Sequence, residues 1–238
     1  MQAITFIKEV EKLRKPVITL NDVARIIQKS KAYTRVYVNR LSKKNLLREV
    51  EKGKYATSED PFEIGSNLIF PSYISFISAY SIYGFTTQTP IELQVISLKS
   101  KKPLSTGNTR ILFVKFKKQN FFGYKREKFR NRYIFIAEPE KAIVDSLYLP
   151  RYCPIAESYT ALKNSDIDIN KLIEYALRMR SIITIKRLGY LLEVNGHDIY
   201  KKVKPQLNKR YDLLDPFLPK SKKKSKKWKL NINEAFND

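Results

Sequence analysis

The side chains best suited to chemistry with a nucleic acid lie between residues 32 and 44. With a period of 3.6 residues, one side of this segment is mostly apolar and carries Thr34, Tyr37, Val38 and Leu41. The opposite side carries arginine, which can bind guanine through two hydrogen bonds, and asparagine, which can bind adenine likewise. The pattern predicts a helix that packs by its apolar side and reads bases in the major groove. The predicted DNA contacts of this reading helix are Lys31, Tyr33, Arg35, Val36, Asn39, Arg40 and Lys43.

A helix-turn-helix is predicted to position the reading helix. Thr19 can cap a short helix that ends near Ile27, because its hydroxyl can accept a free backbone N–H of the first turn. Residues 29–31 interrupt the apolar pattern, and Asn45 tolerates the left-handed conformation that follows a helix. An amphipathic pattern over Met1–Lys15 adds a third helix to the same core.

A β-hairpin is predicted directly after the reading helix. Its strands are Leu46–Val50 and Tyr55–Ala56, with Gly53 in the tight turn between them. Residues 17–18 can form a further short strand that pairs with this wing. The order of helices and strands is that of a winged helix-turn-helix. The predicted phosphate contacts of the wing are Lys52 and Lys54.

The composition favours a polyanionic partner. Among 238 residues, 46 are lysine or arginine and 23 are aspartate or glutamate, which gives a formal net charge of +23. A membrane surface could attract the same charge. However, no apolar run approaches the roughly 20 residues of a spanning helix, and Met1–Lys15 lacks a signal-peptide core. We therefore expect a cytoplasmic protein with double-stranded DNA as its partner.

No cofactor or metal is expected from the residue types. Cys153 is the single cysteine, so an internal disulfide is excluded. His197 is the single histidine and has no second histidine or cysteine nearby, which argues against a zinc site. The chain has 7 glycines, and neither GxxxxGK nor GxGxxG occurs, which argues against a phosphate-binding loop.

One cluster of acids and a lysine is typical of another class of protein. Carboxylates and a lysine after a strand occur in metal-dependent nucleases, where the acids bind a divalent cation. The spacing fits poorly, because no aspartate ends the preceding strand, and Pro139 and the acids equally suit a helix start. We expect no enzymatic activity, and a nuclease targeted by a winged helix remains the alternative. Its candidate residues are Glu138, Glu140, Lys141 and Asp145.

The fold class is predicted as α+β. We expect a winged helix at 1–58, a mixed α/β domain with a small sheet and several helices at 59–215, and a basic tail at 216–238. The expected strands of an antiparallel or mixed sheet are 92–98, 111–116 and 132–137, with loops at 99–108 and 123–131. The expected helices are 72–83, 138–149, 156–163, 170–179, 184–194 and 197–207, the fourth and fifth capped by Asp168 and Thr184.

The lysine-rich segment Lys220–Lys229 is low in complexity and is predicted to be disordered. It can bind phosphate by releasing counterions, so a nonspecific architectural DNA-binding protein is a further alternative. Trp228 could stack on a base or dock on a partner. The predicted phosphate contacts of the tail are Lys222, Lys223, Lys224, Lys226 and Lys227.

Three stretches resemble the AbiEi-type antitoxins, which regulate abortive-infection toxin–antitoxin systems. They read SYISFISAYSIYGFTTQTP at Ser72–Pro90, IAEPEKAIVDSLYLP at Ile136–Pro150 and KRLGYLLE at Lys186–Glu193. The last two are fairly specific together, and the resemblance covers about residues 1–195, including the winged helix. The lysine-rich tail lies outside it.

The resemblance implies a transcriptional repressor of its own operon. In this family the N-terminal domain binds inverted repeats in the promoter, and the C-terminal domain acts against a nucleotidyltransferase-like toxin encoded next door. Members are not known as enzymes. Two half-sites require two protein copies, associated in solution or on DNA. The reading residues named above come from the helical pattern and not from the family.

Overall fold

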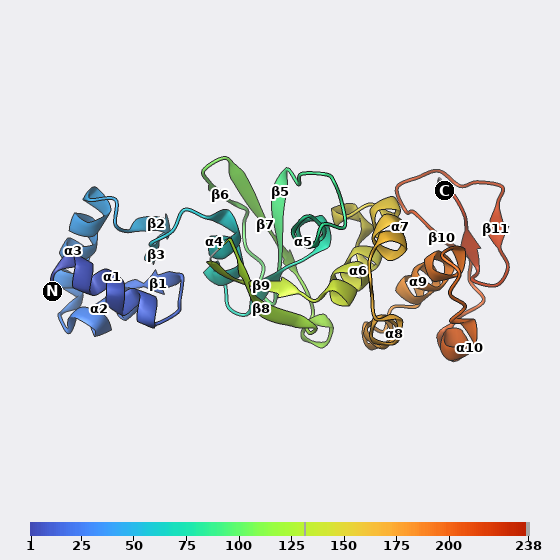
Figure 1. The fold of residues 1–238 in the computed structure, drawn as a ribbon, viewed down its shortest axis with the longest axis horizontal. Helices are drawn as coiled ribbons and strands as arrows, with labels where there is room; N and C mark the ends of the chain where they lie inside the picture. Colours follow the sequence, from blue (N-terminus) through green and yellow to red (C-terminus); the bar gives the residue numbers. More distant parts are fainter. Residues whose placement is uncertain (131, 237–238) are drawn as a thin grey trace. The chain divides into compact units, whose positions relative to one another are not determined.

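The computed structural model describes residues 1–130 and 132–236, and its fold is α+β (Figure 1). The described residues form ten α-helices and three β-sheets. The chain divides into two compact units, which are described separately below. The first comprises residues 1–74, 91–115 and 126–135, and the second comprises 75–90, 116–125 and 136–238. The boundary predicted near residue 58 therefore lies inside the first unit, and the domain limits of 1–58 and 59–215 stay a prediction.

Three helices begin the first unit: α1 (Ala3–Lys12), α2 (Leu20–Ile27) and α3 (Lys31–Lys43). Thr19 caps α2 as predicted, and a capping box closes because its backbone N–H donates to Asp22 Oδ2 at 2.7 Å. The three helices share one apolar core that consists of Phe6, Val10, Ile18, Val23, Ile27, Tyr37, Val38, Leu41 and Leu47.

A three-stranded antiparallel sheet completes this core. Its strands are β1 (Val17–Thr19), β2 (Arg48–Glu51) and β3 (Lys54–Ala56), in the order β1-β3-β2. The predicted pairing of residues 17–18 with the hairpin is confirmed, since Val17 lies opposite Ala56. Gly53 adopts φ +75°, the left-handed conformation that the tight turn requires.

The other sheet of the first unit has six strands in the order β6-β7-β5-β4-β9-β8. It is mixed, because β5 pairs in parallel with β7 and antiparallel with β4. Helix α4 (Pro61–Leu68) packs closely on it: a Cβ at Gly65 would lie 2.8 Å from Leu93. The strands are β4 (Ser72–Ile74), β5 (Glu92–Ser97), β6 (Leu104–Thr106), β7 (Thr109–Lys115), β8 (Tyr124–Phe129) and β9 (Arg132–Ala137).

Three local predictions were wrong in this region. Residues 72–74 form strand β4 and not the first turn of a helix, because they pair with β5. The predicted loop at 99–108 contains β6, which pairs with β7. The predicted loop at 123–131 contains the edge strand β8, and residue 131 itself lies outside the described part. In each case pairing with another strand of the sheet decides the conformation.

Helix α6 lies at the centre of the second unit. Every residue from Glu140 to Leu147 is buried, because α5, α7, α8 and α9 all pack around it. Asp168 caps α8 as predicted, whereas Ser181 and not Thr184 caps α9. The helices are α5 (Phe76–Tyr83), α6 (Pro139–Tyr148), α7 (Ile155–Asn164), α8 (Ile169–Arg178), α9 (Ile182–Val194) and α10 (Tyr200–Val203), the last replacing a longer helix predicted at 197–207.

The prediction of a disordered tail is wrong for the described residues. A third sheet has the order β10-β12-β11 and consists of Asp212–Leu213, Leu230–Asn231 and Lys224–Ser225 respectively. Trp228 is 0% exposed, and the side chains of Leu214, Leu230 and Ile232 are also buried. A few buried apolar residues therefore hold the lysine-rich segment in a folded conformation. Residues 237–238 lie outside the described part. Within it, no helix is both long and apolar enough to cross a membrane.

Candidate nucleic-acid interface

Contacts on the buried side of α3 fix its rotation. Thr34, Tyr37, Val38 and Leu41 are buried, as the helical pattern predicted. The ring of Tyr37 packs edge-on against Phe6 at 5.5 Å, and its hydroxyl donates to Met1 O at 3.2 Å. Because this side is held by contacts with α1, the other side of α3 must face outward.

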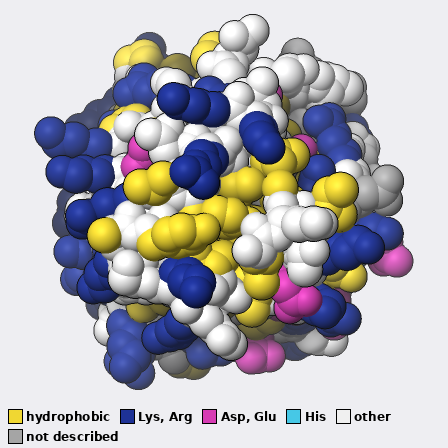
Figure 2. Space-filling model, turned by 90° about the vertical axis from the view of Figure 1, so that its left-hand side faces the viewer, with side chains coloured by type: hydrophobic (Ala, Val, Ile, Leu, Met, Phe, Trp, Pro, Cys, Tyr) yellow, Lys and Arg dark blue, Asp and Glu magenta, His cyan; other side chains and the backbone are white. Residues whose placement is uncertain are grey.

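All seven residues predicted to read DNA lie on the exposed side of α3 or at its start. Tyr33 stacks on Tyr37 at 6.4 Å and remains 44% exposed, while Val36 is 51% exposed. Among the described residues, no carboxylate forms an ion pair with the four cations of this side. These cations are Lys31, Arg35, Arg40 and Lys43, and Asn39 is exposed among them. Figure 2 looks onto the face that carries the N-terminal helices, and in this view lysine and arginine side chains surround apolar ones. The arrangement offers charge for phosphate and apolar atoms for base edges.

The two lysines predicted on the hairpin differ in availability. Lys52 is exposed beside the turn. Lys54 is engaged: its Nζ donates to Leu68 O at 3.1 Å and lies 2.9 Å from the Glu51 carboxylate. Lys101 also binds Glu51, and these two lysines hold the pKa of that carboxyl below its ordinary value. Lys54 is therefore less available than Lys52, because Glu51 and the Leu68 carbonyl bind its ammonium group, and its phosphate contact stays a prediction.

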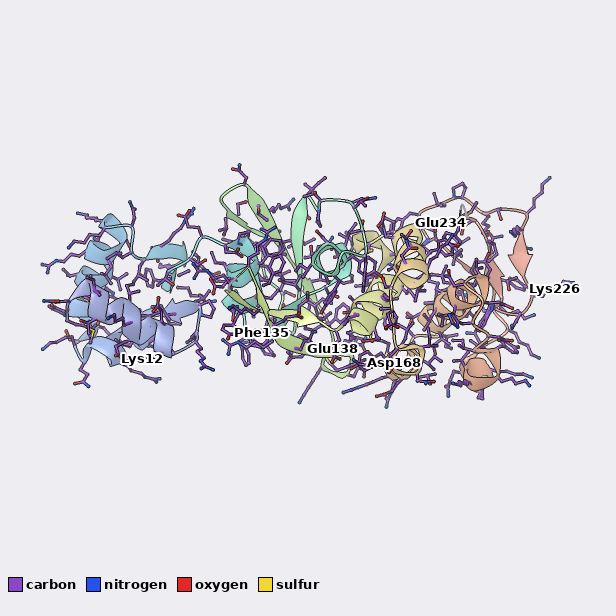
Figure 3. All side chains as sticks on the ribbon, in the orientation of Figure 1. Lys12, Phe135, Glu138, Asp168, Lys226 and Glu234 are labelled. Carbon is purple, nitrogen blue, oxygen red and sulfur yellow. The ribbon has the colours of Figure 1, made fainter. Side chains whose placement is uncertain are left out.

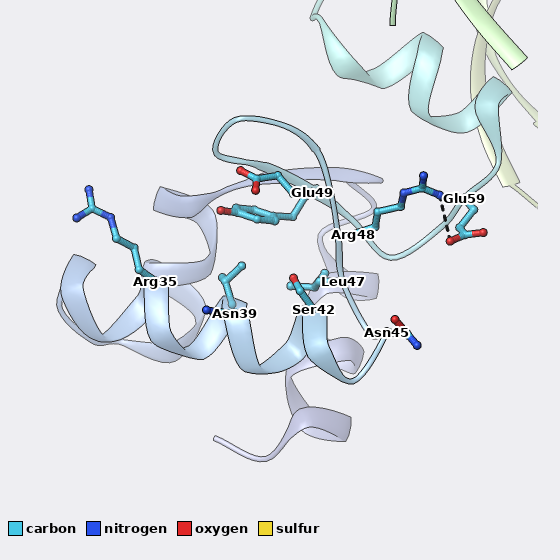
Figure 4. A pocket seen from close by; sticks show the side chains of 10 residues that line it. Arg35, Asn39, Ser42, Asn45, Leu47, Arg48, Glu49 and Glu59 are labelled. Carbon is cyan, nitrogen blue, oxygen red and sulfur yellow. Dashed lines mark hydrogen bonds and ion pairs between the residues drawn. The ribbon is translucent and has the colours of Figure 1, made fainter. Parts of the chain in front are cut away.

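A polar pocket opens between α3 and the hairpin (Figure 4). Ser42 and Asn45 line it beside Asn39, and neither was singled out from the sequence as a DNA contact. Arg48 also lines it, but its guanidinium lies 3.2 Å from Glu59. This ion pair depends on tertiary structure.

The four candidate nuclease residues do not form an open site. Lys141 and Asp145 are both 0% exposed and bonded to each other, and Asp145 also accepts from Ser75 Oγ at 2.9 Å. Burial lowers the pKa of Lys141, and the charge of Asp145 opposes that shift. Lys171 lies 3.4 Å from Glu138 and 3.1 Å from Glu140. A lysine thus already pairs with each of these carboxylates, and no group of three or more potential metal ligands occurs in the described part of the chain.

The KRLGYLLE stretch anchors the C-terminal residues. Lys186 Nζ donates to Asn208 Oδ1 at 2.7 Å and to Asp212 Oδ2 at 2.8 Å. Arg187 Nε donates to Leu214 O at 2.8 Å, and burial lowers the pKa of its guanidinium to about 10. Two cations inside α9 therefore bind polar groups of residues 208–214.

Trp228 packs against the part of α9 that contains Gly189 and Glu193. The Trp228 indole N–H donates to Glu193, and the ring covers Gly189, where a Cβ would lie 2.1 Å from the nearest ring atom. Alanine in place of glycine inside a helix normally stabilises by about 1 kcal/mol. Here we expect Gly189→Ala to destabilise instead, by about 1–3 kcal/mol or more, because the core is overpacked. Thermal unfolding measures the sign, and a stabilised Gly189→Ala would contradict the contact. Gly189→Ala/Trp228→Leu should recover part of the loss.

The lysines predicted as phosphate contacts of the tail lie on this folded segment. Lys222, Lys223, Lys224 and Lys226 are exposed. Lys227 is engaged within the protein, because its Nζ lies 2.6 Å from Glu193 and 3.1 Å from Asp198. Acids from α9 and the following loop thus engage its ammonium group, and its phosphate contact stays a prediction.

Comparison with known proteins identifies a shared fold. No family model matches the chain, and no curated protein matches its sequence. Among solved structures it is similar to the crystal structure of the RV2827C protein from Mycobacterium tuberculosis, with a TM-score of 0.62 and 13% sequence identity. The likeness covers 94% of this chain and 88% of that chain. At this identity, the likeness concerns the α+β fold alone.

Proposed function

We propose that the protein is a sequence-specific DNA-binding repressor, in which residues 1–58 form a winged helix-turn-helix and α3 reads the major groove. The observation that carries this proposal is the exposed side of α3, with four cations, Asn39 and two apolar side chains. Its opposite side is fixed by the core, so the exposed side is presented as one rigid surface. Lys52 extends the same chemistry to the wing, where it can contact phosphate.

The resemblance to AbiEi-type antitoxins motivates the regulatory part of the proposal. In this role the repressor autoregulates the operon of a toxin–antitoxin system and opposes a nucleotidyltransferase-like toxin. The three matching stretches overlap α5, α6 and α9, where Asp145 and Lys186 hold buried polar networks together. The resemblance thus rests largely on residues that build the second unit. A repressor must reach promoter DNA, so the proposal implies a cytoplasmic location.

The proposed mechanism is promoter occlusion and requires no cofactor. A winged helix covers one half-site, so inverted repeats require two copies. Binding of both copies over the promoter would exclude RNA polymerase by steric overlap. Phosphate contacts set position and strength, while base contacts in the major groove select the sequence.

A mobility-shift assay with the DNA upstream of the protein's own gene tests the proposal. We expect retardation that survives an excess of random duplex. Loss of the complex under random competitor at rising salt would favour a nonspecific architectural protein instead. Incubation of plasmid with magnesium or manganese tests the nuclease alternative. A repressor leaves the plasmid intact, and cleavage that Asp145→Asn abolishes would refute the proposal.

Val36 offers a separate test of base reading. Its side chain can contact a thymine methyl group, because it lies in the middle of the exposed side of α3 and β-branching makes it rigid. One buried methyl contact is worth about 0.8 kcal/mol, which is roughly 4-fold in affinity. We therefore expect an operator with deoxyuridine in place of thymidine to bind the native protein roughly 4-fold more weakly. Val36→Ala should bind both operators equally. A deoxyuridine effect of the same size in Val36→Ala would refute this contact.

A further inference from the structure

The C-terminal module, residues 200–232, has many more basic than acidic side chains. Residues 200–231 contain twelve lysines and arginines and two aspartates. Asp212 is bonded to Lys186, and Asp215 is buried. The carboxylates of the module itself are therefore unable to neutralise most of its cations. Such an excess raises the free energy of the compact state through self-repulsion unless a partner compensates it.

The module is nevertheless folded, and residues of α9 hold it. Lys186 and Arg187 bind the chain at residues 208–214, and Gly189 receives the buried ring of Trp228. The two-residue strand β12 pairs with β10 on one side and β11 on the other. The backbone that carries the lysines of the module is therefore folded and not a flexible tail.

Several of these lysines project into solvent without a countercharge. Within residues 1–130 and 132–236, no carboxylate forms an ion pair with the four exposed lysines Lys220, Lys222, Lys223 and Lys226. Lys226 projects away from the ribbon in Figure 3. Lys224 and Lys229 lie over the exposed ring of Tyr211, at 5.7 and 5.4 Å from its centroid. Cations gathered in this way on a folded module form a positively charged surface.

We propose that this module is a second DNA-binding surface, which binds the phosphate backbone of a duplex without reading its sequence. Duplex DNA has the required charge density, one phosphate charge per ~1.7 Å of helix axis. Lysine provides point charges that suit phosphate. Trp228, the side chain best able to stack on an unpaired base, is buried and bonded to Glu193, which favours a duplex over a single strand. The surface shares no residue with α3 and does not depend on the proposed repressor function.

The salt dependence of binding gives the expected size of the effect. Each neutralised phosphate contributes roughly 0.9 to the slope of log affinity against log salt. Replacing the four unpaired lysines should therefore reduce the slope for a random duplex by roughly 3 to 4. At about 100 mM salt, we expect the affinity to fall at least about 10-fold, because fewer counterions are released.

The test uses the full-length protein and a random duplex of about 30 base pairs in salt titrations. The module variant is Lys220→Gln/Lys222→Gln/Lys223→Gln/Lys226→Gln. The matched control removes four exposed lysines elsewhere, as Lys8→Gln/Lys102→Gln/Lys117→Gln/Lys118→Gln. A large loss in the module variant with a small one in the control supports the proposal. Equal losses in the two variants, or no loss in the module variant, would overturn it, because bulk charge would then account for the binding.

A second variant asks whether the folded surface matters. Trp228→Ala keeps every lysine but removes the ring that holds the module against α9. We expect it to lose part of the affinity for a random duplex, whereas a disordered basic tail would bind DNA equally well with or without this ring. Circular dichroism and operator binding verify that the rest of the chain stays folded. Undiminished affinity of folded Trp228→Ala would overturn the proposal.

Two further measurements separate the module from other sources of binding. Arg35→Ala/Arg40→Ala should lose operator preference but keep the salt slope of random duplex, so failure of the repressor proposal is distinguishable from failure of this one. Vesicles that contain phosphatidylglycerol test an anionic lipid surface. Loss of vesicle binding in the module variant, with retained DNA binding, would assign the lysines to lipid and overturn the proposal.

Discussion

Arg35→Ala/Arg40→Ala is expected to abolish operator recognition while the protein stays folded. Both side chains are exposed on α3, and neither forms an ion pair among the residues described, so their removal leaves the core unchanged. A bidentate arginine–guanine contact is worth about 1–3 kcal/mol of discrimination. Loss of two such contacts corresponds to roughly 30-fold weaker operator binding or more, and a mobility-shift titration measures it.

A charge-matched variant controls for bulk electrostatics. Lys8→Ala/Lys117→Ala also removes two exposed cations, and both of them lie outside α3 in the sequence. It should reduce operator binding only slightly. Unchanged operator binding in Arg35→Ala/Arg40→Ala, or equal loss in both variants, would remove α3 from the mechanism. Thermal unfolding should show that both variants are as stable as the native protein, within the roughly 0.5 kcal/mol usual for surface substitutions.

The first three helices were predictable because their signals are local. Thr19 and Asn45 define ends of helices, and Gly53 defines the hairpin turn, through conformations that each residue type favours within a few positions. The period of the apolar residues then assigned the two sides of α3 correctly. The candidate DNA contacts on this helix could therefore be named from the sequence, apart from the pocket residues Ser42 and Asn45.

Contacts between elements explain why the partners of two lysines and the folding of the tail were not predicted from the sequence. Lys54 and Lys227 looked like free cations, but a carbonyl and carboxylates from other elements bind them. The lysine-rich tail looked too polar to fold. Its anchor is one tryptophan, Trp228, whose ring fits over Gly189 in the preceding long helix α9. Composition over a short window does not record a partner surface supplied by another helix.

The burial of Lys141 and Asp145 could not be predicted from the sequence either. In the sequence, the segment that contains Lys141 and Asp145 reads as the polar start of a helix, and an exposed carboxylate cluster was a reasonable alternative. In the structure four helices surround it, and the ammonium of Lys141 lies 4.7 Å from the centre of the Phe122 ring. The spacing of i and i+4 is one at which two charges on a helix can meet, but only tertiary packing shows that both are enclosed.

Asp145→Ala is therefore expected to be among the most destabilising single substitutions in the chain. It leaves the buried ammonium of Lys141 without its countercharge and Ser75 without its acceptor. Removing one partner of a buried pair costs about 3–5 kcal/mol. Lys141→Met/Asp145→Leu removes both charges and should be far closer to the native protein in stability. Urea denaturation of the two variants measures the difference.

The pH dependence gives this prediction a second, independent readout. Burial already lowers the pKa of Lys141 below its ordinary value of 10.5, and the loss of Asp145 lowers it further. Between the folded pKa and 10.5 the unfolded chain binds more protons, so the stability of Asp145→Ala should rise with pH in that window. Lys141→Met/Asp145→Leu lacks the titrating group and should not show this rise. The loss of stability of Asp145→Ala relative to the native protein could instead stay constant up to about pH 10. That result would mean that water, and not Asp145, stabilises the ammonium of Lys141.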